Sequence, residues 1–98
     1  METAIRQAAG ARSRPEVLHY NTLDGSKFCG AVNTYGFAKI FYAEKDPGGG
    51  LSVIVQPTID HDPNPDRLAV RRNVGRQTII ISGKCKAANL PIGPVDRR

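Results

Sequence analysis

The chain has few of the features that mark secreted or zinc-binding proteins. It contains two cysteines, Cys29 and Cys85, and neither belongs to a Cys-x-x-Cys pair. No histidine has zinc-finger spacing, so a structural zinc site is not expected. A disulfide between the two cysteines is possible, but a single bridge is not the framework of a secreted protein. We therefore expect both to be reduced, as small apolar residues on strands of a cytoplasmic protein.

Long apolar segments and catalytic signatures are also absent. Residues 1–6 lack the apolar run of a signal peptide, and no segment approaches the roughly 20 apolar residues of a membrane span. No membrane partner is expected. His19 and His61 are the only histidines, and no recognisable motif surrounds a serine or cysteine nucleophile. The sequence therefore predicts a protein without enzyme activity.

One acidic cluster resembles a cation site in residue type only. Asp60, His61, Asp62 and Asp66 lie close together in the chain, and carboxylates are suitable ligands for divalent cations. Two prolines interrupt the cluster, however, and the spacing is not that of an EF-hand loop. A solvated loop is the better interpretation, and we expect neither a metal nor another cofactor.

The residues that are plentiful favour a small β domain. Ten glycines and seven prolines in 98 residues favour short strands and turns over long helices. Alternating or β-branched runs predict strands over residues 16–23, 27–32, 35–43, 51–56 and 76–82. Asp24-Gly25 is a hairpin-turn dipeptide, and Asn33-Thr34 is read as a bend.

The later part of the chain is harder to assign. Residues 68–72 are expected to form a short strand or one helical turn, 73–75 a turn, and 84–90 a further extended piece. The predicted fold class is all-β, a small five- to six-stranded OB-like barrel over residues 16–94. Residues 1–15 are expected to be a flexible basic arm, and residues 95–98 a C-terminal tail.

Charge and aromatic residues suggest a polyanionic partner. The net charge is +5, the isoelectric point is about 9.6, and no acidic residue occurs between Arg67 and Val95. Such a surface suits phosphate groups. Tyr35, Phe37 and Phe41 alternate with Lys39 beside them, so they can share one strand face and stack on bases. The alternative is that these aromatics pack inside the barrel.

A partial resemblance to a known family supports the same idea. Residues 30–32 followed by 35–40 resemble the first strand and the nucleic-acid-binding motif of the cold-shock domain. Residues 48–53 resemble that family's loop and third strand, and residues 75–81 with 83–90 resemble its last strand and ending. The resemblance covers about residues 27–90 and implies a five-stranded OB-type barrel that binds single-stranded RNA or DNA. The second aromatic motif of the family has no counterpart at residues 52–56.

The sequence thus predicts a basic β-barrel that binds single-stranded nucleic acid. The alternative is a viral or phage structural protein, or another protein–protein interaction module that forms a homo-oligomer through sheet edges. The residues predicted to contact nucleic acid are basic or aromatic: Tyr35, Phe37, Lys39, Arg71, Arg72, Arg76, Lys84 and Lys86.

Overall fold

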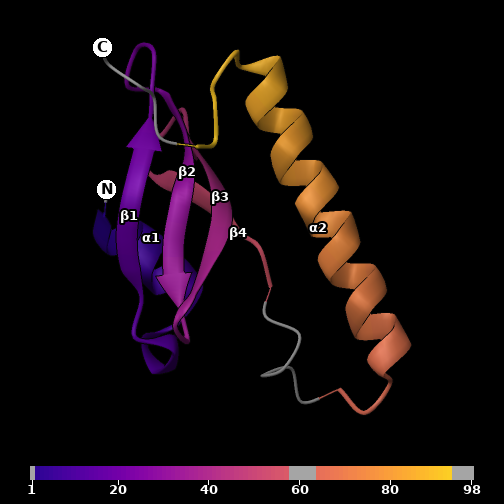
Figure 1. The fold of residues 1–98 in the computed structure, drawn as a ribbon. Helices are drawn as coiled ribbons and strands as arrows, with labels where there is room; N and C mark the ends of the chain where they lie inside the picture. Colours follow the sequence, from indigo (N-terminus) through magenta and orange to yellow (C-terminus); the bar gives the residue numbers. More distant parts are fainter. Residues whose placement is uncertain (1, 58–63, 94–98) are drawn as a thin grey trace.

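The described part of the chain forms an open antiparallel sheet with a helix on each face. The computed structural model describes residues 2–57 and 64–93. The elements follow in the order α1 (Glu2–Ala9), η1 (Ala11–Ser13), β1 (Glu16–Asn21), β2 (Lys27–Thr34), β3 (Phe37–Lys45), β4 (Leu51–Val55) and α2 (Arg67–Ala87). The sheet has the order β1-β2-β3-β4 with every neighbouring pair antiparallel. Figure 1 shows α1 and α2 on opposite sides of it.

The expected strands are confirmed in the first half of the chain, and the first turn has the expected residues. The Asp24-Gly25 turn connects β1 to β2, with Gly25 at φ +80°. The Asp24 carboxylate accepts hydrogen bonds from the Ser26 hydroxyl and the Ser26 N–H. These bonds to the charged form, that of the hydroxyl first, lower the pKa of Asp24 below its usual value.

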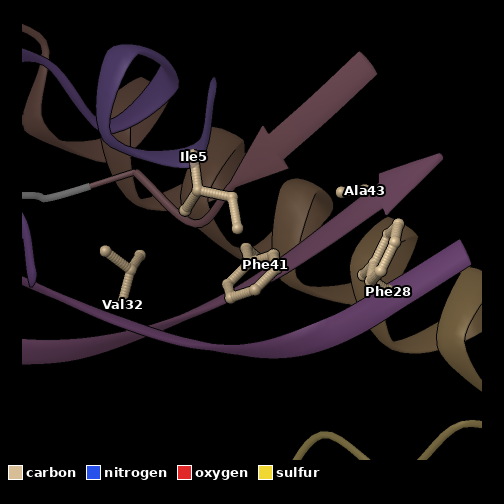
Figure 2. Packing of buried hydrophobic residues seen from close by; sticks show 5 residues of the cluster. All are labelled: Ile5, Phe28, Val32, Phe41 and Ala43. Carbon is tan, nitrogen blue, oxygen red and sulfur yellow. The ribbon is translucent and has the colours of Figure 1, made fainter. Parts of the chain in front are cut away.

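Alternation along β2 and β3 creates two apolar faces. On one face, Phe28, Val32, Phe41 and Ala43 surround Ile5 of α1, as Figure 2 shows. Ile5 is fully buried, and its side chain points from α1 toward Phe41. Residues 1–15 were expected to form a flexible arm, with a short helix from Thr3 to about Ala9 as the alternative; the helix forms as α1, η1 follows it, and Ile5 belongs to the core. Helix α1 is amphipathic, and its apolar side buries Ile5, which a flexible arm would leave in solvent.

The other face of the sheet packs against the C-terminal half of α2. Cys29 and Tyr42 of the sheet contact Ile81 and Cys85 of the helix and Leu90 just beyond it. Cys29 and Cys85 form a disulfide across this layer. The expectation of two reduced cysteines was therefore wrong, because the fold brings residues 56 positions apart into contact.

Helix α2 is the main departure from the expected all-β fold. Residues 76–82, expected as the last strand, and residues 73–75, expected as a turn, lie in the middle of this 21-residue helix. Val70, Ile81 and Cys85 are buried at helical spacing. Within the described residues the sheet has four strands and does not close. The five-stranded barrel implied by the cold-shock resemblance is thus not formed there, because the segment matched to its last strand is helical.

Helix α2 is capped at both ends. The Asp66 side chain caps the first turn by accepting a hydrogen bond from the Ala69 N–H at 3.1 Å. At the other end, Asn89 has φ +56°, and the Leu90 N–H reaches back to the Cys85 carbonyl at 2.9 Å. This is a Schellman ending, and the buried Leu90 side chain completes it.

The disulfide predicts a large dependence of stability on redox state. Reduction, or the double substitution Cys29→Ala and Cys85→Ala, should lower the free energy of unfolding by about 4 kcal/mol, because the unfolded chain is no longer cross-linked. Urea unfolding with and without reductant measures this change. Reductant should not affect the double variant. An unchanged free energy after reduction verified by mass spectrometry would contradict the prediction.

Gly30 lies at the closest contact between two strands. A Cβ at this position would collide with the His19 carbonyl oxygen and lie 2.7 Å from the Tyr20 Cα. Phe41 pairs with Gly30 across the sheet, and Tyr20 pairs with it from the other side. The missing side chain therefore allows β1 to approach β2 closely.

This close approach predicts that Gly30→Ala is costly. We expect a loss of about 1–3 kcal/mol in the free energy of unfolding, because backbone atoms of β1 must move to admit the methyl group. The matched control is Gly48→Ala in the β3–β4 loop, where a Cβ meets no atom within 4 Å. The control should change stability by less than about 0.5 kcal/mol. Equal effects of the two substitutions in thermal unfolding would refute the packing argument.

Candidate nucleic-acid interface

The β2–β3 hairpin ends in a two-residue turn formed by Tyr35 and Gly36. Their φ angles are +52° and +84°, and two successive positive values are what a type I′ turn requires. The bend expected at Asn33-Thr34 was therefore placed two residues too early. The Tyr35 N–H donates to the Ser13 carbonyl oxygen at 2.9 Å, so η1 lies directly against this turn.

Phe37 and Lys39 follow the turn on the α1 face of the sheet. The register pairs Phe37 with Thr34 and Lys39 with Val32, and Val32 packs in the cluster around Ile5. Phe37 is 63% exposed and Tyr35 is 37% exposed. Phe41 is fully buried, so the alternative of packing inside the fold holds for this one of the three alternating aromatics. Two aromatic side chains remain at the surface of the hairpin.

Two arginines lie next to the same turn in the fold. Arg12 belongs to η1, and Arg14 is the residue that follows η1. Arg12 and Arg14 flank Ser13 and are exposed. Arg14 has φ +50°, a left-handed conformation that costs about 1–2 kcal/mol for a residue with a side chain. We use the name hairpin end for the exposed or half-exposed basic and aromatic residues gathered here: Arg12, Arg14, Tyr35, Phe37 and Lys39.

Helix α2 carries a second basic surface. Arg71, Arg72 and Arg76 are all exposed in its N-terminal half, and the helix contains no acidic residue. None of the three forms an ion pair with another described residue. Arg72 and Arg76 are like charges one helical turn apart, an arrangement that disfavours the helix slightly. Helix stability does not explain these arginines.

Lys84 and Lys86 lie at the opposite end of α2 and have a structural explanation. Cations in the last turn of a helix interact favourably with its dipole. The Lys84 Nζ also lies 5.5 Å from the centre of the Tyr42 ring, in cation–π geometry. Burial raises the pKa of Tyr42, and the charge of Glu44 adds to the effect. Lys84 therefore already has a partner inside the protein.

The structure divides the eight predicted site residues between two surfaces. Tyr35, Phe37 and Lys39 belong to the hairpin end on the α1 side, whereas the five basic residues belong to α2, which lies on the other side of the sheet (Figure 1). Arg12 and Arg14 join the first group, although the sequence reading placed them in a free arm. The positive charge of Arg12 and Arg14 can be recognised in the sequence, but their position near the Tyr35 turn depends on the fold.

The acidic cluster of the sequence lies mostly outside the described residues. Asp60, His61 and Asp62 lie outside them, while Asp66 serves as the N-cap of α2. Across residues 2–57 and 64–93, no group of three potential metal ligands occurs. In the same ranges no helix has both the length and the apolar content to cross a bilayer.

Comparisons with protein-family models, with curated proteins and with solved structures found no match for this chain.

Proposed function

We propose that the protein binds single-stranded nucleic acid at the hairpin end. The observation that carries the proposal is the exposed ring of Phe37, 63% accessible at the surface, on the same strand face as Lys39 and next to a turn that is hydrogen-bonded to Ser13 between two exposed arginines. Single exposed apolar side chains are ordinary on protein surfaces, but Phe37 comes directly after the turn that holds the half-exposed Tyr35, so two rings lie together at the surface. Single-stranded nucleic acid has both chemistries that fit: flat bases for the rings and phosphates for the cations.

The aromatic rings would bind the bases, and the cationic side chains would bind the phosphates. Stacking of a base on an aromatic side chain contributes about 1–3 kcal/mol and accepts any base. Arg12, Arg14 and Lys39 would contact phosphates, which adds affinity through counterion release and makes binding salt-dependent. The exposed arginines of α2 supply further phosphate contacts for strands long enough to reach the other side of the sheet.

The proposal predicts salt-dependent binding that depends on Phe37. Fluorescence anisotropy with a labelled oligothymidine or oligouridine should give an affinity that falls steeply between low and moderate salt. Phe37→Ala should weaken binding about 5-fold or more, the equivalent of losing one stacked base. Leu23→Ala is the matched control, because Leu23 is 75% exposed on a different turn. No binding at low salt, or a response that is flat with salt, would end the proposal.

A second candidate is self-association through a sheet edge. Strand β4 lies at one edge of the sheet, pairs only with β3 among the described residues, and contains no charged side chain. Uncharged edge strands are templates for pairing with another chain. Such an interaction module would act without catalysis and without nucleic acid, as a viral or phage structural component does.

Size-exclusion chromatography with light scattering tests this second candidate. In a preparation free of nucleic acid, pairing of β4 strands predicts a closed dimer. Ser52→Lys, which adds a charge at the one exposed residue of β4, should convert it to a monomer. A monomer at all concentrations would exclude the second candidate.

The disulfide is relevant to the cellular location of the protein, whichever function it has. The cytoplasmic location expected from the sequence stays a prediction, and its alternative is an oxidising compartment, where disulfides persist.

A further inference from the structure

A groove of about 500 Å³ lies between α1 and the residues that follow η1. It is lined by Thr3, Arg6, Gln7, Arg14 and Pro15. Small-molecule sites typically have volumes of about 300–1,000 Å³, so the groove is large enough for a nucleotide. None of its residues except Arg14 takes part in the hairpin end.

The groove and the hairpin end are continuous. Arg14 belongs to both, and the neighbouring Ser13 accepts the hydrogen bond from the Tyr35 N–H. The Ser13 hydroxyl in turn donates to the Gly10 carbonyl at 2.7 Å and lies 3.2 Å from the Ala9 carbonyl. These bonds hold η1 against the end of α1, so the two walls of the groove are fixed relative to the turn.

The side chains of the groove suit a nucleotide. Two guanidinium groups, from Arg6 and Arg14, can pair with phosphate oxygens or stack flat on a base. The Gln7 amide has a donor and an acceptor for a base edge, and Pro15 offers an apolar surface. Glu2 lies 3.8 Å from Arg6, but both side chains are more than half exposed. A pair of that kind is weak and leaves the Arg6 charge available to an anion.

We propose that this groove holds one nucleotide of the bound strand, next to the bases that stack on Tyr35 and Phe37. Arg14 links the two parts by contacting the phosphate between them, and Gln7 contacts the base. This inference rests on the proposed function and adds to it a pocket for a single nucleotide, lined by α1.

Nuclear magnetic resonance titration of the oxidised full chain with a nucleoside 5′-monophosphate tests the inference. We expect saturable shifts at the amides of Thr3, Gln7 and Arg14. Gln7→Ala should weaken mononucleotide binding severalfold, and the substitution favours the helix, because alanine has the higher helix propensity. Arg14→Gly should weaken it tenfold or more; glycine accepts the φ of +50° without strain, so the fold should be retained. The control Leu23→Ala, on the turn between β1 and β2 and outside both basic surfaces, should leave mononucleotide binding unchanged.

A parallel titration with a labelled oligonucleotide separates the two proposals. If the oligonucleotide binds through Phe37 but the mononucleotide does not shift the groove residues, the pocket is wrong and the proposed function stands. If inorganic phosphate shifts the same residues as strongly as the nucleotide, the groove is an anion site and the inference is overturned. If neither nucleic acid binds at low salt, both proposals fall together.

Discussion

The Cys29–Cys85 disulfide is the constraint on which the arrangement of the two halves of the chain depends. It joins the middle of the sheet to the C-terminal half of α2, and Tyr42, Ile81 and Leu90 pack around it. Beyond α2 the chain returns along β1, where the Asn21 side chain bonds to the Pro91 carbonyl at 2.7 Å. Near the middle of α2, the Gln56 side chain just beyond β4 donates a hydrogen bond to the Thr78 hydroxyl at 2.9 Å. Arg71, Arg72 and Arg76 remain exposed.

The β2–β3 hairpin serves both stability and the proposed function. Its middle contributes Val32 and Phe41 to the core around Ile5 (Figure 2). Its turn leaves the Tyr35 and Phe37 rings at the surface, beside the arginines that flank Ser13. Because the buried part of the hairpin fixes the register, the exposed rings have a defined position relative to those arginines. A rigid scaffold of this kind places binding residues without ordering them on binding.

The first four strands were predictable because each has a short-range signal. Asp24-Gly25 marks the first turn, and alternation from Lys27 onward gives the two faces of the hairpin. Helix α2 was missed for a local reason: Thr78 and the three isoleucines that follow favour a strand, and Gly75 favours a turn before them. The pattern that indicates a helix extends over a longer stretch of the chain than the pattern that favours a strand. Apolar residues at Val70, Val74, Ile81 and Cys85 recur at helical spacing, and this period outweighs local propensity once one face is buried.

The sequence by itself determined the charge distribution, the first turn at Asp24-Gly25, and which aromatic and basic residues were candidates for the site. Tertiary structure decided which of those candidates meet. It buried Phe41, engaged Lys84 with Tyr42, and placed Arg14 next to Tyr35. The physical reason is that side-chain alternation assigns residues to faces within one strand. Contacts between segments far apart in the chain depend on the packing of α1 and α2 against opposite faces of the sheet.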